Sequence, residues 1–286
     1  MLIAIKSDNE DIAGAIVYWR LSGDINGDDL NNALSDVGLE QHHVSLPGPR
    51  RALRRAMQEF ATGEVFLRAG KQGDGGLYLV RQVPGEDGPE FKVWVEARLS
   101  TAGVPTFECR DFSDITFPEA NDIAEQLTSR FWHHVFHLEA ADVSSWLIDQ
   151  ARECDALSLR DSGGVYFIPR HKVDAWGLRV DILSTETNCQ VYMIPALHSD
   201  DAVGAVMQAL VDECTTFTKQ MQDDIASECL GVRALQNKAT RAKSLLSKLT
   251  RYEDLLGTKL TEVRDQIVEQ ETNAIQAALS AGGDDE

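Results

Sequence analysis

The sequence predicts an α+β protein in which antiparallel sheet elements and packed helices are followed by a long C-terminal helical hairpin or coiled coil. Between residues 64 and 111, four segments alternate apolar and polar side chains and are separated by turns rich in Gly, Pro and Asp. This pattern is typical of an antiparallel meander. After residue 199, apolar residues recur every three, four or seven positions and no proline occurs, which favours helices.

The N-terminal part adds a strand and two helices to this framework. The segment GAIVYWRLSG, residues 14–23, predicts a strand that ends at glycine. Leu30 and Leu34 then follow helical spacing until Gly38, and Pro49 is suited to the first turn of a second helix. We therefore expect three consecutive parts: an α+β unit with the meander over 1–114, helices with a hairpin-helix-strand unit over 115–198, and a helical arm with an acidic tail over 199–286.

The Gly-Gly pair in LRDSGGVYFIP, residues 159–169, could form either a phosphate-binding loop or a hairpin. A phosphate loop requires a helix directly after the glycines, so that backbone N–H groups converge on the anion. Here the glycines are followed by VYFIP, which is β-branched and aromatic and ends in proline. The sequence therefore predicts a hairpin with a glycine turn.

Composition and charge exclude several classes of protein. The formal net charge of -19 argues against indiscriminate binding of nucleic acid, so that such a role would need a local basic patch. No segment is long and apolar enough to span a bilayer, and the first residues do not resemble a signal peptide. We therefore expect no membrane partner. The five cysteines include no C-x-x-C pair, which indicates reduced thiols in a cytoplasmic protein.

The segment FWHHVFH offers one candidate metal site. His133 and His137 are four residues apart, and one helical turn allows two imidazoles to reach the same ion. A structural helix is the alternative, because aromatic residues are interleaved with the histidines. A metal site needs further ligands, and the fold would have to supply them from His42, His43, Cys109 or Glu139. The acidic segment DINGDD, residues 24–29, lacks the glycine and glutamate of a calcium loop and predicts a capped helix start.

Two basic segments are candidates for nucleic-acid binding. The segment PRRALRRAM predicts a helix whose polar side carries Arg50, Arg51, Arg54 and Arg55 ahead of a β-hairpin, an arrangement found in winged-helix proteins. The second is a band without acids between residues 229 and 251; its members are Arg233, Lys238, Arg241, Lys243, Lys248 and Arg251. Acidic segments flank this band, so pairing with the acidic helix before it is the favoured alternative.

The C-terminal heptad spacing predicts a contact surface. An amphipathic helix pair must bury its apolar seam, and partner helices usually cover it. The expected interface positions are Leu249, Tyr252, Leu256, Val263 and Ile267. No Ser-His-Asp arrangement, G-x-S-x-G elbow, Walker loop or cofactor motif is recognisable, so no catalytic residue or cofactor is predicted.

The segments PRRALRRAM, LRDSGGVYFIP and LTRYEDLLG, in this order ahead of a helical C-terminus, resemble a family of uncharacterised proteins encoded by bacteria and their phages. The resemblance extends from about Ser45 to Leu260. It implies a phage or mobile-element setting in the host cytosol, with no assigned activity and no catalytic residues to transfer.

Three functions follow as hypotheses. The first is a non-enzymatic accessory protein that assembles with itself or with a larger complex, for example to scaffold or inhibit a machine that handles nucleic acid. The second is a DNA-associated protein that uses the arginine helix. The third is a metal-dependent enzyme built on His133 and His137.

Overall fold

The computed structural model describes residues 12–70, 76–85, 88–110, 117–160, 163–227 and 230–281. The chain forms two compact units that interleave along the sequence. Unit 1 comprises Met1–Arg20, Leu147–Ser184 and Cys189–Glu286, and unit 2 comprises Leu21–Trp146 and Thr185–Asn188. The predicted α+β class, with antiparallel sheets and helices at the C-terminus, is confirmed. Within the described ranges, no helix is both long and apolar enough to cross a membrane.

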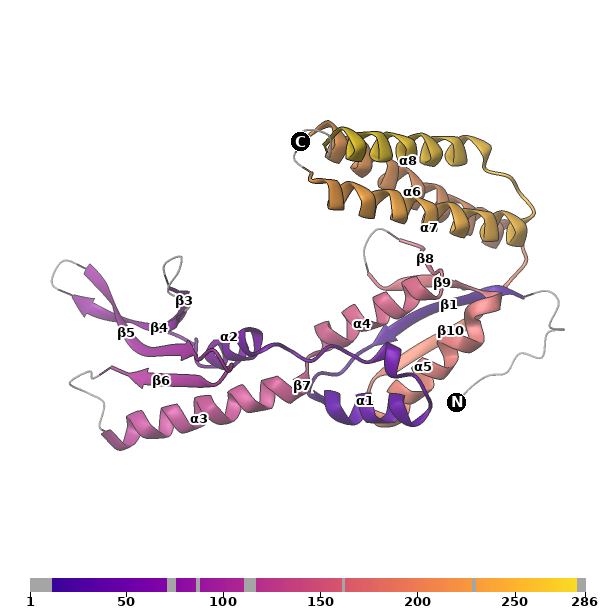
Figure 1. The fold of residues 1–286 in the computed structure, drawn as a ribbon. Helices are drawn as coiled ribbons and strands as arrows, with labels where there is room; N and C mark the ends of the chain where they lie inside the picture. The colour runs from indigo at the N-terminus through magenta and orange to yellow at the C-terminus, as the bar shows by residue number, and fades with distance from the viewer. Residues whose placement is uncertain are drawn as a thin grey trace. The chain divides into compact units, whose positions relative to one another are not determined.

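Unit 1 is built on a four-stranded antiparallel sheet with the order β10-β1-β9-β8 (Figure 1). The predicted N-terminal strand, β1 (Ile12–Arg20), lies between β10 (Gln190–Leu197) and β9 (Val165–Pro169). Because β9 and β10 both run antiparallel to β1, they are parallel to each other and need a crossover connection. Helix α5 (Val173–Glu186) provides it on one face of the sheet, where Trp176 packs near Trp19.

The Gly-Gly segment forms the predicted hairpin. β8 (Leu157–Ser158) pairs antiparallel with β9, with Leu157 opposite Phe167. Gly163 has a φ of +86°, which favours glycine, and the Val165 amide donates to the Gly163 carbonyl. A strand follows the glycines, so this segment does not present the helix N-terminus that a phosphate-binding loop requires.

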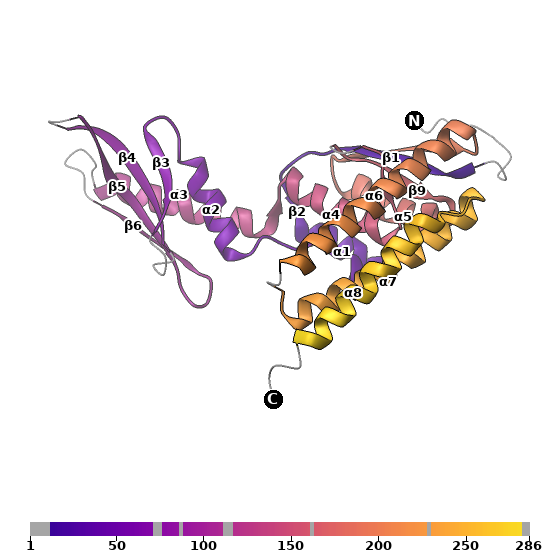
Figure 2. The same cartoon turned by 90° about the horizontal axis from the view of Figure 1, so that it is seen from above.

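Three helices cover the opposite face of this sheet: α6 (Asp200–Ala226), α7 (Val232–Leu256) and α8 (Thr261–Ala281). Figure 2 shows α7 and α8 side by side along their length. The apolar spacing continues from residue 245 to 267, but α7 ends at Gly257, whose φ is +65°. A left-handed glycine is a common helix terminator, and the seam continues on the next helix after this break.

Unit 2 contains the predicted meander as a second four-stranded antiparallel sheet. Its strands follow the chain in order: β3 (Val65–Ala69), β4 (Leu77–Gly85), β5 (Gly88–Leu99) and β6 (Pro105–Cys109). One face packs against α2 (Pro49–Glu59) and α3 (Phe117–Phe136). Leu53 and Met57 of the arginine-bearing helix are fully buried in this core, on the side of the helix away from the predicted polar side.

The remaining elements of unit 2 surround a small two-stranded sheet. β2 (Ile25–Asn26) pairs with β7 (His137–Leu138). Asn26 caps α1 (Gly27–Asp36) by accepting from the Asp28 and Asp29 amides, so DINGDD begins a capped helix as predicted. A 3-10 turn, η2 (Glu40–His42), follows, and α4 (Ala140–Glu153) divides between the two units.

Candidate metal centre

The small β2–β7 sheet of unit 2 brings Asp24 to the two predicted histidines. Asp24 directly precedes β2, and Asn26 lies opposite His137 in the pairing. His133 is on the last turn of α3, but the helix ends at Phe136 and His137 begins β7. The two imidazoles lie together as their spacing suggests, although His137 is the first residue beyond the helix. Asp24 has a φ of +63°, a left-handed conformation that Asp adopts more readily than most residues.

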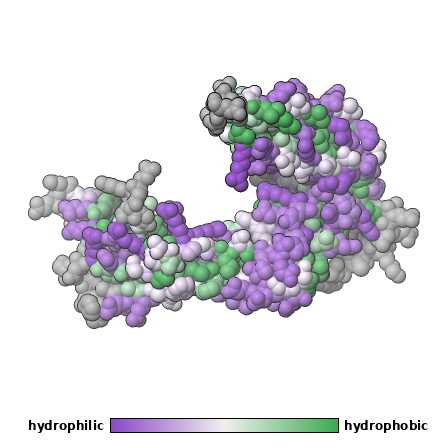
Figure 3. Space-filling view, in the orientation of Figure 1, coloured by the Kyte–Doolittle hydropathy of each residue, from purple (hydrophilic) through white to green (hydrophobic). Residues whose placement is uncertain are grey.

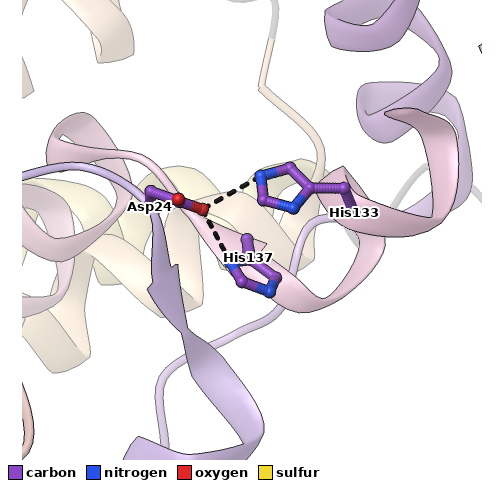
Figure 4. A group of neighbouring side chains, drawn as sticks. All are labelled: Asp24, His133 and His137. Carbon is purple, nitrogen blue, oxygen red and sulfur yellow. Dashed lines mark hydrogen bonds and ion pairs between the residues drawn. The ribbon is translucent and has the colours of Figure 1, made fainter. Parts of the chain in front are cut away.

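The three side chains converge on one point (Figure 4). His137 Nδ1 lies 2.7 Å and His133 Nε2 lies 2.9 Å from the same carboxylate oxygen, Oδ1 of Asp24. The two imidazole rings stack with their centroids 4.1 Å apart. One ligand atom from each residue fits within 4.8 Å of the others. Atoms bound about 2.1 Å from one ion at right angles are about 3.0 Å apart, so small shifts would place all three on an ion.

The protonation state of His133 suits a metal ligand. Partial burial and the neighbouring His137 lower the pKa of His133 below its ordinary value, although the charge of Asp24 acts in the opposite direction. The imidazole is therefore neutral near pH 7. A neutral imidazole has the free lone pair that a metal ion requires.

Neighbouring contacts hold the end of α3 in place. His134 contacts α2, with its Nε2 2.7 Å from Glu59 Oε1. Arg130 Nε contacts the other oxygen of Glu59 at 3.2 Å. These two contacts fix the last turn of the helix, and with it the position of His133, by joining α3 to α2.

The further ligands expected from the sequence lie elsewhere. His42 is buried and its carbonyl accepts from the Trp146 indole, while exposed His43 lies 2.8 Å from the Ser35 hydroxyl. Glu139 pairs with Arg55, and Cys109 packs beside the core of the meander. Asp24 was missed because it is far from the histidines in the sequence, and because DINGDD was tested only as a calcium loop.

The arginine helix divides its cations between an ion-pair network and solvent. Arg51 Nη2 and Arg55 Nη2 contact the two oxygens of Asp142 at 2.6 and 2.7 Å, and Arg55 Nε also contacts Glu139 at 2.9 Å. Arg50 and Arg54 are exposed. Two of the four arginines of this helix are thus engaged in ion pairs within unit 2.

The C-terminal basic band lies beside the acidic helix before it, as predicted. Lys248 Nζ contacts Glu213 Oε2 at 2.7 Å and donates to the Ala156 carbonyl, and Lys238 pairs with Asp224. Arg251 binds Asp155, Lys243 lies 3.7 Å from Glu271, and Arg241 lies over the Phe217 ring. Arg233 is exposed. Most of the band therefore makes contacts within unit 1.

The predicted interface residues pack inside unit 1. Leu249, Tyr252 and Ile267 are buried in the core between the sheet and α6–α8, and Leu256 and Val263 pack against it while partly exposed. The Tyr252 hydroxyl donates to the Asp155 carbonyl. A contact with a partner through these residues would require the helices to separate.

Comparison with known proteins gives one match. A family model described as "Family of unknown function (DUF6744)" matches residues 12–281. No curated protein and no solved structure is detectably similar to the chain. The matched range covers all of unit 2, most of unit 1 and all three residues of the candidate metal centre.

Proposed function

The chain belongs to the DUF6744 family of unknown function, and from its geometry we propose that it binds a divalent transition-metal ion through Asp24, His133 and His137. The observation that carries this proposal is the convergence of both imidazoles on one oxygen of Asp24, at 2.9 and 2.7 Å. Three donors from a helix end, a strand and a loop point to a common centre. An ordinary surface ion pair would need one histidine.

The donor set indicates the type of ion. Two imidazole nitrogens and one carboxylate oxygen suit Zn²⁺, Fe²⁺ and similar ions better than Mg²⁺ or Ca²⁺, which prefer oxygen ligands. The side chain of Asp24 is 69% exposed, and those of the histidines are about one-third exposed. Solvent thus reaches the centre, and a bound ion would keep open coordination positions.

Open positions favour a catalytic over a structural site. Structural zinc sites are closed by four protein ligands, whereas catalytic sites use three and leave the fourth position for water or substrate. A metal-bound water becomes acidic enough to supply hydroxide near pH 7. We therefore favour a metal-dependent enzyme over the DNA-associated alternative, because contacts within the units engage most of the candidate DNA-binding cations.

The test is metal binding by the full chain. Protein purified without chelators is analysed for bound metals, and metal-free protein is titrated with Co²⁺, whose visible absorption reports nitrogen and oxygen ligation. We expect about one equivalent of metal per chain. Asp24→Asn and His137→Gln should each weaken Co²⁺ binding at least about tenfold, because each removes one of three ligands.

His43→Gln provides the matched control, because it removes an exposed imidazole of the same unit that lies outside the cluster. It should leave Co²⁺ binding unchanged. Less than about a tenth of an equivalent of metal, together with no Co²⁺ absorption on titration, would overturn the proposal. Equal weakening by His43→Gln and His137→Gln would also contradict it, because binding would then be nonspecific.

A further inference from the structure

The outer strand of the unit 1 sheet presents an apolar edge. Among the described strands, β10 pairs with β1 on one side and with none on the other (Figure 1). Its sequence, QVYMIPAL, contains no charged residue. Four large apolar side chains of this strand are exposed: Tyr192, Met193, Ile194 and Leu197.

Neither helical layer covers the middle of this strand, residues 192–194. Tyr192 and Ile194 lie opposite Tyr18 and Ile16 of β1, on the face that α6–α8 cover over the inner strands. The ring of Tyr192 stacks on Tyr18 with a centroid separation of 4.8 Å, and both remain exposed. Met193 lies opposite the fully buried Val17, toward the face where α5 packs, and it is exposed as well.

An edge of this composition is unusual in a protein that stays monomeric. A free strand edge has unpaired N–H and C=O groups, and natural proteins protect such edges with charged side chains, bulges or short strands. β10 is eight residues long and carries only Pro195 as a protecting residue. Proline lacks an N–H group, so the stretch available for pairing is 190–194, which includes the exposed residues Tyr192, Met193 and Ile194.

We infer that the outer edge of β10 pairs antiparallel with the same strand of a second copy of this chain. The distribution of charge favours a second copy of the chain as the partner. A chain with a formal net charge of -19 repels another copy over much of its surface, and in the view of Figure 3 hydrophilic residues make up much of the surface of unit 1. The uncharged β10 strip can meet its own copy without opposing like charges, and a twofold axis makes the contact self-complementary.

The proposed contact between copies is therefore at the edge of the unit 1 sheet, and not at the C-terminal apolar seam that the sequence predicted. Leu249 and Ile267 are already buried within the chain, whereas Ile194 is 50% exposed. Pairing two β10 strands would join two four-stranded sheets into one continuous sheet, with main-chain hydrogen bonds for affinity and the apolar side chains for specificity. The contact is independent of the proposed metal centre, which lies in unit 2.

The test is the mass of the full chain in solution. Size exclusion with light scattering should give about twice the chain mass of 31.6 kDa. Ile194→Lys puts a charged side chain into the paired strand of each copy, a device by which natural edge strands avoid pairing, and should raise the dimer dissociation constant at least about tenfold. Leu279→Lys is the matched control, because it adds the same charge at an apolar side chain that is 73% exposed on α8. Circular dichroism establishes that both variants are folded.

Hydrogen exchange provides a second, local measurement. In the dimer, amides within 190–194 should exchange more slowly than in the Ile194→Lys monomer, while amides of α8 should not differ. A wild-type chain that is monomeric at every accessible concentration overturns the inference. A dimer that survives Ile194→Lys, or that is equally sensitive to Leu279→Lys, overturns the assignment to β10.

Discussion

The Nδ1 atom of His137 lies 2.7 Å from Oδ1 of Asp24, although 113 residues separate them in the sequence. The chain connects them through the pairing of β2 with β7, in which Asn26 lies opposite His137. The short sheet therefore determines the geometry of the candidate metal centre. Residues that hold β2 and β7 together should matter to the site even where they offer no ligand.

The first prediction links metal binding to stability. A ligand that binds the folded chain and not the unfolded chain stabilises it, by about 2.7 kcal/mol at a free concentration one hundred times the dissociation constant. Zn²⁺ should therefore raise the midpoint of thermal unfolding, and a chelator should reverse this increase. His133→Gln should abolish the response, because the ion loses one of its three ligands, whereas His43→Gln should retain it. Equal responses in both variants would mean that zinc acts elsewhere.

The second prediction concerns the ion pairs between α2 and α4. Asp142 has a side-chain exposure of 4% and forms ion pairs with Arg51 and Arg55. Arg55→Ala leaves this buried carboxylate with one exposed arginine, and loss of a buried partner typically costs about 3 kcal/mol. Hydrogen exchange should show this cost as a lower free energy of opening for the α2 amides, which would exchange faster than in wild type.

The control for this experiment is Arg54→Ala on the same helix. Arg54 is exposed, and surface substitutions usually change stability by less than about 0.5 kcal/mol. If both variants lower the protection of α2 equally, the loss reflects helix propensity and not the buried ion pair.

Local sequence patterns predicted those parts of the fold whose signals are local. The alternation between residues 64 and 111 corresponds to β3–β6, and LRDSGGVYFIP corresponds to the β8–β9 hairpin, because side-chain period and turn residues act over a few positions. The helix break at Gly257 was missed because apolar spacing continues across it from Tyr252 to Val263. The spacing of apolar residues predicts which face of a helix is buried, but it does not predict where the helix ends and the chain reverses direction.

The candidate site was predictable only in part, because its residues meet through tertiary structure. His133 and His137 stood out because a fixed spacing links them, whereas Asp24 has no sequence relationship to either.

The sequence also predicted the C-terminal apolar seam only in part. Heptad spacing predicts that Leu249 and Ile267 are buried, but it contains no information on whether the covering helices belong to the same chain. Here α6–α8 and the sheet of unit 1 cover them.

The third prediction concerns Glu253, which closes the turn between α7 and α8. Its side chain is 1% exposed, accepts from the Leu260 amide at 2.7 Å and pairs with Arg264 at 2.5 Å. Burial alone would raise the pKa of Glu253, but the Leu260 amide and the Arg264 guanidinium outweigh it, and the pKa is lowered from its ordinary 4.5. Glu253→Gln removes the charge and should destabilise the chain by about 2 kcal/mol near pH 7.

The pH dependence of this effect follows from the sign of the shift. A carboxylate whose pKa is lower in the folded state binds fewer protons there than in the unfolded state, so its stabilisation is present above pH 4.5 and is lost as the pH falls through the lowered pKa. Urea denaturation at several pH values should show the difference between wild type and Glu253→Gln shrinking below pH 4.5. A difference that stays constant down to the lowest pH would mean that the carboxylate charge does not contribute.

The last prediction uses two glycines of unit 1 for which the same substitution should have opposite effects. Gly14 lies in β1, where an added Cβ would be 2.2 Å from the Ile168 carbonyl oxygen of β9. Gly14→Ala must therefore push the two central strands apart, and overpacking of this kind costs about 1–3 kcal/mol. Gly177 lies within α5, and outside the backbone of that helix no atom of the described residues is within 4 Å of such a Cβ. Gly177→Ala should therefore stabilise the chain by about 0.5–1 kcal/mol through helix propensity and reduced unfolded-state entropy. Urea denaturation of wild type and the two variants measures whether each substitution raises or lowers the free energy of unfolding. Destabilisation by Gly177→Ala would show that α5 is packed more closely than this geometry allows, whereas a neutral Gly14→Ala would show that β1 and β9 can separate at little cost.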